Sequence, residues 1–262
     1  MQKQNRMQQK SLLEPLREGL LSLAIWAGIA LLLVLVWVAS VLSVVLFGWW
    51  DKDRRVVHEC VKCWAKAVIA LNPYWRLQID DQAKLDPDGA YVFVANHQSL
   101  ADVVVLPHVG LPYKCLSKSS LFHFPFVGWT LSLSRHIPLK RGSVRSTRRA
   151  MEQARAWLKR RMPVAFFAEG TRSRTGALQP FKPGAFKLAV EMGAAVVPLA
   201  ITGTRDALPR GTWCFRHKVQ GKLTILPPIS TRGLSLSDVD QIKQRAAQAI
   251  AAVLKQAQHT LN

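Results

Sequence analysis

The chain has 262 residues, and its 36 Lys and Arg against 16 Asp and Glu give a formal net charge of +20. That length suits one α/β catalytic domain with an appended segment, and the basic surplus limits the partners to nucleic acid, an anionic bilayer or phosphate-bearing substrates. The four cysteines include a single Cys-x-x-Cys pair, which excludes a zinc site built from two such pairs.

The N-terminal segment contains a long run with no charged residue, from Gly19 to Trp50. About 20 apolar residues suffice to cross the core of a bilayer, and the run is too long for a cleavable signal peptide. Two forms fit it: one tilted helix, or a re-entrant hairpin that breaks near Gly28, Ser40 or Ser43. Lys and Arg flank both ends of the run, so we favour the hairpin, with both ends on one side of the membrane.

A change of composition near Asp51 divides the chain into an N-terminal membrane-anchoring segment, residues 1–51, and a catalytic domain, residues 52–262. The apolar run makes an anionic membrane surface and phosphate-bearing substrates the expected partners, and nucleic acid is not expected. The expected location is a membrane, of the bacterial inner-membrane type, with the catalytic domain on the cytoplasmic face.

The stretch from Val56 to Leu71 has an amphipathic helical pattern. Such a helix can lie along the membrane interface or pack on the catalytic core, and the pattern does not choose between these. Within it, His58, Cys60 and Cys63 allow a minor metal-binding hypothesis, but reduced thiols on a helix are the favoured interpretation.

Downstream of the anchor, short apolar runs alternate with longer helical patterns. The alternation predicts an α/β fold with a largely parallel sheet sandwiched by helices. Expected strands are 92–95, 113–116, 137–139, 164–167, 195–201 and 223–226, and expected helices are 144–161, 186–192 and 236–258.

The segment after the first of these strands carries the strongest sign of chemistry. His97 lies in the turn that follows the strand, and Asp102 comes five residues later, ahead of an apolar helical run. A carboxylate bound to one imidazole nitrogen leaves the other free to take a proton from a hydroxyl. The alternative is that Ser99 and Asp102 only form a capping pair and His97 is an ordinary turn residue.

A second polar cluster follows the strand 164–167. Gly170 allows close approach of a ligand to the backbone, and Arg172 supplies a planar fork that fits a phosphate or carboxylate. Glu169 would accept from a substrate hydroxyl or hold the arginine. Because ligands bind at the carboxyl ends of parallel strands, this cluster and His97 are expected to face one crevice.

The two clusters resemble the first and third sequence blocks of the glycerolipid acyltransferase family. The second and fourth blocks are similar to 137–141 and 197–201, although Lys140 stands where that family usually has an acidic residue. The likeness covers about residues 90–205 with the order of the blocks kept. It implies His97 and Asp102 as catalytic residues, and as substrate-binding residues it implies Lys118, Arg141, Glu169, Gly170, Thr171 and Arg172.

The resemblance implies direct acyl transfer from a thioester, carried by acyl-CoA or acyl-carrier protein, to the hydroxyl of 1-acyl-glycerol-3-phosphate. The chain has no Gly-x-Ser-x-Gly nucleophile elbow, which agrees with a mechanism without an acyl-enzyme. No motif calls for a metal or a cofactor. The alternatives are the same chemistry on glycerol-3-phosphate or another lyso-lipid, such as an aminolipid, and a non-enzymatic protein that binds anionic lipid.

Overall fold

The computed structural model describes residues 2–73, 75–173, 175–208, 212–215 and 218–260, with side chains from Arg17 to Gln258 within these ranges. Their centre is a seven-stranded sheet in the order β1-β7-β6-β2-β5-β3-β4, in which every neighbouring pair is parallel except β6 and β7. The strands are β1 (Trp75–Asp81), β2 (Tyr91–Ala95), β3 (Lys114–Lys118), β4 (Ile137–Leu139), β5 (Val164–Phe167), β6 (Ala195–Thr202) and β7 (Val219–Ile225).

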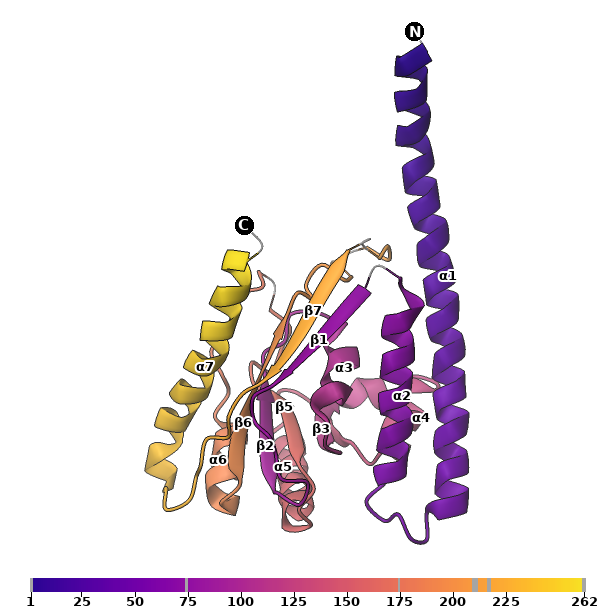
Figure 1. Ribbon diagram of the computed structural model, residues 1–262. Coiled ribbons are helices and arrows are strands. Elements are labelled where there is room, and N and C mark those ends of the chain that lie inside the picture. The colour runs from indigo at the N-terminus through magenta and orange to yellow at the C-terminus, as the bar shows by residue number, and fades with distance from the viewer. Residues whose placement is uncertain (1, 74, 174, 209–211, 216–217, 261–262) are drawn as a thin grey trace.

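Helices cover both faces of this sheet (Figure 1). One face carries α5 (Val144–Lys159), α6 (Gly184–Met192) and α7 (Val239–Thr260). The opposite face carries α1 (Gln2–Phe47), α2 (Arg55–Leu71), α3 (Asp102–Val105) and α4 (Val127–Leu133). The short 3-10 helices are η1 (Leu106–Val109), η2 (Ser119–His123) and η3 (Leu236–Asp238).

Strand β2 shows why the sheet is covered on both faces, because all five of its residues are buried. Val92 and Val94 point into the core formed with α5, α6 and α7, whereas Phe93 and Ala95 point into the core on the other face. The expected α/β fold with a largely parallel sheet is confirmed.

Two elements did not emerge from the sequence pattern, the strand β1 and the helix α4. Strand β1 lies at one edge of the sheet, and most of its residues are polar and at least partly exposed, so it lacks the apolar run of a central strand. Helix α4 has only seven residues, too few to show a helical period.

The N-terminal run is one unbroken helix, so the expected break near Gly28, Ser40 or Ser43 is wrong. The hydroxyls of Ser40 and Ser43 donate to the carbonyls of Val36 and Ala39, four residues earlier, which keeps them within a regular helix. Within residues 17–47 of this helix, the most apolar window of 18 residues has a mean hydropathy of 3.0, and the helix is long and apolar enough to cross a membrane by length and composition.

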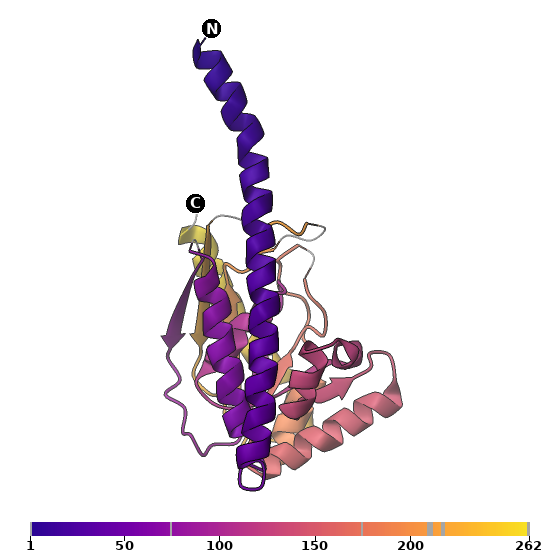
Figure 2. The ribbon, with the colours of Figure 1, turned by 90° about the vertical axis from the view of Figure 1, so that its right-hand side faces the viewer.

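A hairpin does exist, but it is formed by α1 and α2 (Figure 2). A Cβ on Gly28 would lie 2.8 Å from a methyl carbon of Leu71, so glycine lets the two helices approach closely here. At the other end of the pair, the Ser43 Oγ is 3.4 Å from the Cys60 Sγ, which makes the helices antiparallel. Helix α2 also buries Val68 beside Val104 of α3, so it packs on the protein core, the second of its two expected placements.

The turn between α1 and α2 contains the predicted boundary at residue 51, but the two sides of that boundary share a core. Ile25 of α1 is 4% exposed and packs in one apolar cluster with Trp75 of β1 and with Phe215, which precedes β7. The Trp26 indole nitrogen donates to the Trp213 carbonyl at 2.8 Å, and the Ser22 hydroxyl accepts from the Phe215 backbone. Helix α1 is therefore part of the folded domain as well as a helix long and apolar enough to cross a membrane.

The same turn is fixed to the sheet by a buried lysine. The Nζ of Lys114 donates to the carbonyls of Asp53 at 2.7 Å and Ser134 at 2.8 Å, and it lies 4.9 Å from the centre of the Trp157 ring. Burial lowers the pKa of Lys114 to about 7, although the nearby acids Asp53 and Asp51 oppose that shift.

Lys114 makes the stability of the protein depend on alkaline pH. The unfolded chain, with a lysine pKa of about 10.4, binds more protons than the folded chain between about pH 7 and pH 10, so the free energy of unfolding rises with pH in that window. We expect the variant Lys114→Met to lose this rise, as measured by denaturant unfolding at a series of pH values. Lys159→Met, on the exposed face of α5, should keep the wild-type pH dependence; an unchanged slope in Lys114→Met would contradict the assignment.

Candidate active site

His97 and Asp102 form a hydrogen-bonded pair at the carboxyl end of β2. The His97 Nδ1 is 2.8 Å from the Asp102 Oδ2, and the Asp102 side chain is fully buried, whereas that of His97 is 11% exposed. A carboxylate only accepts, so His97 carries its proton on Nδ1 and its Nε2 is free to accept one.

The backbone around the pair also donates to Asp102. The N–H groups of Gln98 and Ser99 donate to the Asp102 Oδ2 at 2.7 and 2.9 Å. The Ser99 hydroxyl accepts from the Ala101 backbone and not from that of Asp102, so only half of the expected capping pair forms. Asp102 thus holds the turn and orients His97 at the same time.

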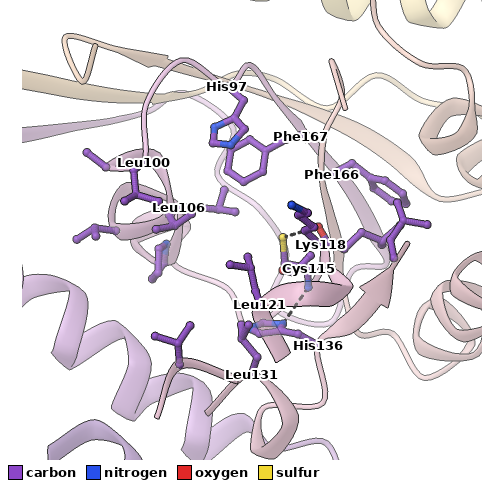
Figure 3. Close-up of a pocket in the computed structure, with 18 of the residues that line it drawn as sticks. His97, Leu100, Leu106, Cys115, Lys118, Leu121, Leu131, His136, Phe166 and Phe167 are labelled. Atoms are coloured by element: carbon purple, nitrogen blue, oxygen red, sulfur yellow. Dashed lines mark hydrogen bonds between the residues drawn. The ribbon is translucent and has the colours of Figure 1, made fainter. Parts of the chain in front are cut away.

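A phenyl ring lies against the imidazole. The rings of His97 and Phe167 stack at 4.0 Å between centroids with an interplanar angle of 22°, and Phe167 is the last residue of β5 (Figure 3). Because β2 and β5 are parallel neighbours, their carboxyl ends bring the two predicted clusters to one place. The expectation that both clusters face one crevice is met.

Glu169 of the second cluster braces the first. Its Oε1 accepts from the backbone N–H of His97 at 2.7 Å, and its Oε2 accepts from that of Gln179 at 3.0 Å. The residue is 3% exposed, and burial raises the pKa of its carboxyl although these two N–H groups oppose that shift. Both of these contacts are with the backbone, so Glu169 joins the loop after β5 to the His97 turn.

His97 opens on a cavity of about 1400 Å³ that runs between the sheet and the helix pair α1 and α2. In the close-up, His97 and Phe167 lie at one end, Leu131 and His136 lie at the other, and Cys115 is between them (Figure 3). The walls supplied by α1 and α2 are mostly apolar: Trp26, Ile29, Leu33, Val36, Val61, Trp64 and Val68. The cavity can thus take a long apolar chain that ends near the imidazole.

The far end of the cavity is uncharged near neutral pH. Burial lowers the pKa of His136 to about 3 and raises the pKa of Cys115 to about 12, and it also raises the pKa of Tyr113. The His136 Nδ1 accepts from the Cys115 backbone N–H at 3.0 Å, which fixes the ring. These three side chains therefore add no charge to the cavity near neutral pH.

Several proteins that resemble this chain are named as acyltransferases. Residues 76–202 match the family described as Acyltransferase. The chain is 36% identical over 206 residues to the 1-acyl-sn-glycerol-3-phosphate acyltransferase BAT2, chloroplastic, of Brassica napus, which covers 78% of this chain and 58% of that protein. It is 30% identical to the human 1-acyl-sn-glycerol-3-phosphate acyltransferase alpha, with coverage of 69% and 64%. The chain contains an acyltransferase domain, residues 76–202.

The fold agrees with that assignment. The crystal structure of the 1-acyl-sn-glycerophosphate (LPA) acyltransferase PlsC from Thermotoga maritima superposes with a TM-score of 0.68 at 24% identity, over 91% of this chain and 98% of that one. The chain spans 58%, 60% and 50% of three plant and algal acyltransferases that it matches. The matched family region contains both β2 and β6 and so includes the whole His97 turn.

Three basic residues line the cavity of this acyltransferase domain: Lys118, Arg141 and Lys182. Lys118 ends β3, which extends two residues beyond the expected strand 113–116, and Arg141 follows β4. Both were expected to bind substrate, whereas Lys182 was not predicted. Gly170 has a φ of +74°, and a Cβ there would lie 3.5 Å from the Lys182 Cγ, so the lysine side chain runs past the glycine. The contact joins residues 12 positions apart, which sequence spacing alone did not reveal.

The third block places its other members differently. Gly170 and Thr171 line the cavity, as expected for substrate-binding residues. Arg172 is exposed and does not line the cavity, so its expected role in substrate binding stays a prediction.

The minor metal hypothesis for α2 receives no support from the described residues, which contain no group of three His, Cys, Asp or Glu side chains placed to hold a metal ion. His58 is buried and meets the Tyr113 ring edge-on at 4.9 Å between centroids. Burial lowers the pKa of His58 to about 3, so the ring packs there in its neutral form.

The bracing role of Glu169 predicts a loss of stability when its charge is removed. In Glu169→Gln one of the two acceptor oxygens becomes an NH2 group, which cannot accept from a backbone N–H, so we expect a loss of about 1–3 kcal/mol in the free energy of unfolding. Denaturant unfolding checks this, with Glu152→Gln on the exposed face of α5 as the control. A Glu169→Gln variant as stable as the wild type would contradict the bracing role.

Proposed function

We propose that this protein transfers a fatty acyl group from a thioester, acyl-CoA or acyl-carrier protein, to the free hydroxyl of 1-acyl-glycerol-3-phosphate and so forms phosphatidic acid. The observation that carries the proposal is the 2.8 Å contact between His97 and Asp102 at a cavity that is lined by Lys118, Arg141 and Lys182 and by many apolar side chains. The names of the relatives agree with this acceptor.

In the proposed reaction, the His97 Nε2 takes the proton of the acceptor hydroxyl while that oxygen attacks the thioester carbonyl carbon. The C–S bond then breaks, and the leaving sulfur receives the proton from the imidazolium. Asp102 stays ionised throughout and stabilises the imidazolium that forms between the two steps. The Nδ1 proton already directed at Asp102 leaves His97 in the tautomer that this sequence requires.

The acceptor phosphate is proposed to bind at Lys118, Arg141 and Lys182. Charge-assisted hydrogen bonds from these side chains would hold the glycerol with its free hydroxyl toward His97, and orientation of this kind contributes several kcal/mol to the rate. The apolar remainder of the cavity would take an acyl chain, which gains about 0.8 kcal/mol for each buried methylene. Both lipids thus bind with their polar and apolar parts matched to the walls.

The enzyme is proposed to work at an anionic membrane surface, with the catalytic domain on the cytoplasmic face. The apolar part of α1, 31 residues, is about 46 Å long at 1.5 Å for each residue, longer than a bilayer core of about 30 Å. Trp49 and Trp50 at the end of this helix are 80% and 70% exposed, as is common for aromatic residues at a lipid interface. Neither lipid then needs to leave the bilayer completely.

Purified protein in liposomes, supplied with lysophosphatidic acid and either long-chain acyl-CoA or acyl-carrier protein, tests the proposal. We expect phosphatidic acid with at least one donor. A panel of acceptors that includes glycerol-3-phosphate and aminolipid lyso forms tests the choice of acceptor. If phosphatidic acid forms with neither donor, the proposed reaction is wrong. Greater activity on another lyso-lipid would show that this lipid, and not 1-acyl-glycerol-3-phosphate, is the acceptor.

Arg141 gives a direct test of phosphate binding. We expect Arg141→Ala to raise the KM for the acceptor about tenfold or more, because a charge-assisted contact of roughly 1.5–3 kcal/mol is lost. Arg145→Ala is the matched control, since Arg145 is exposed four residues further on and does not line the cavity. Steady-state kinetics at varied acceptor concentration measure the KM of each variant. Equal increases in the two variants would show that the net positive charge of the protein, and not a contact with Arg141, sets the KM.

A further inference from the structure

The buried oxygen of Asp102 that faces away from His97 has its own partner. The hydroxyl of Thr204 lies 2.5 Å from the Asp102 Oδ1, and Thr204 is 2% exposed. Thr204 follows β6 and is 102 residues from Asp102, so this contact depends on the pairing of β6 with β2. Thr204 belongs to none of the sequence motifs described above.

The direction of this hydrogen bond follows from the neighbouring groups. The side-chain amide nitrogen of Gln98 donates to the Thr204 Oγ at 3.1 Å and to the Ile201 carbonyl at 2.9 Å. A hydroxyl has one proton, and a carboxylate only accepts, so the Thr204 proton points to Asp102. Gln98, Thr204 and Asp102 therefore form a chain of donors that ends at the carboxylate.

The backbone holds Thr204 at this place. Gly203 has a φ of +72°, and a Cβ there would come within 1.7 Å of the Gln220 carbonyl oxygen on β7, so the turn after β6 requires glycine. On the other side, the Asn96 side chain exchanges two hydrogen bonds with the backbone of Ile201, at 2.8 and 2.9 Å. These contacts tie the end of β6 to the His97 turn.

We propose that Thr204 is a positioning residue for the acyl transfer, which acts by fixing and polarising the Asp102 carboxylate that orients His97. With Thr204, the carboxylate receives hydrogen bonds from two backbone amides, one hydroxyl and one imidazole. The hydroxyl fixes Oδ1 and so directs Oδ2 at the His97 Nδ1. It also draws charge away from Oδ2, which limits how strongly the carboxylate holds the imidazole proton.

This inference rests on the proposed acyl transfer for its kinetic test. We expect Thr204→Val, which keeps the shape and removes the donor, to lower kcat about tenfold or more, as for one charge-assisted hydrogen bond. The acceptor KM should change much less, because Thr204 does not line the cavity. The acidic limb of the profile of kcat/KM against pH should move to higher pH, since Oδ2 then holds the proton of the imidazolium more strongly.

Two matched variants separate positioning from packing. Thr204→Ser keeps the hydroxyl, so it should restore most of kcat and return the acidic limb of the kcat/KM profile to its wild-type pH. Thr224→Val is the control for the change itself, because Thr224 of β7 is 1% exposed and its hydroxyl has no partner among the described residues. Glu169, which accepts from the His97 backbone, and the basic cavity residues Lys118, Arg141 and Lys182 are the same in every variant. A difference in the pH profile between variants therefore comes from residue 204.

A spectroscopic readout keeps the test independent of turnover. In the proton NMR spectrum of the full chain, the His97 Nδ1 proton should give a downfield signal that moves in Thr204→Val and returns in Thr204→Ser. If Thr204→Val fails to fold, Thr204→Cys, with a weaker donor of similar size, takes its place. A wild type that makes no acyl transfer product would remove the proposed function while the NMR comparison still tests the contact.

Two results would overturn the role of Thr204. One is a Thr204→Val enzyme with wild-type kcat, pH limb and Nδ1 signal. The other is a Thr204→Ser enzyme as impaired as Thr204→Val, which would show that the methyl group and its packing matter rather than the hydroxyl.

Discussion

Replacement of His97 by alanine is expected to lower kcat by about 10² to 10⁴, the range for loss of a general base. The reason is that the Asp102 carboxylate, 2.8 Å away, orients the imidazole of His97. Among the described residues, no other histidine is hydrogen-bonded to Asp102. Phosphatidic acid formation under saturating substrates measures the loss. The acceptor KM should change little, because Lys118, Arg141 and Lys182 remain at the cavity.

The control for this variant is His123→Ala. His123 is exposed and does not line the cavity, so its removal should leave turnover and folding unchanged. Thermal unfolding of His97→Ala should stay close to that of the wild type, since the imidazole itself is not part of either large apolar core. A His97→Ala enzyme with near-normal turnover would show that another group takes the hydroxyl proton.

Removal of residues 1–50 is expected to leave no stable catalytic domain. The deletion uncovers Trp75 and Phe215, which pack against Ile25, and it opens the wall of the cavity formed by Trp26, Ile29 and neighbouring residues. Lost burial of this kind is large against a net stability of about 5–15 kcal/mol. Circular dichroism and size-exclusion chromatography in detergent should show unfolded or aggregated protein.

The control for that deletion is removal of residues 1–14. The first turns of α1 project beyond the rest of the molecule (Figure 1), so the shorter protein should fold and keep its activity. A well-folded and active protein that lacks residues 1–50 would show that α1 is only an anchor. That outcome would favour the division at residue 51 that composition suggests.

The sheet was largely predictable because its central strands are buried on both faces and their apolar runs can be recognised without a partner. The edge strand β1 was not, since its residues are mostly polar and its pairing with β7 joins segments more than 130 residues apart. The sequence also failed to predict that α1 is one unbroken helix. Gly28, Ser40 and Ser43 resemble helix breaks in sequence, and their contacts with Leu71, Val36 and Ala39 exist only in the fold.

The site divides in the same way. His97 and Asp102 are five residues apart, so the turn that joins them was readable from the sequence alone, as was a ligand at the carboxyl ends of parallel strands. The tertiary structure decided the rest: Glu169 as a brace, Arg172 outside the cavity, Lys182 within it, and Thr204 behind Asp102. These roles depend on which strands lie side by side and where each loop turns, and local residue patterns do not encode that order.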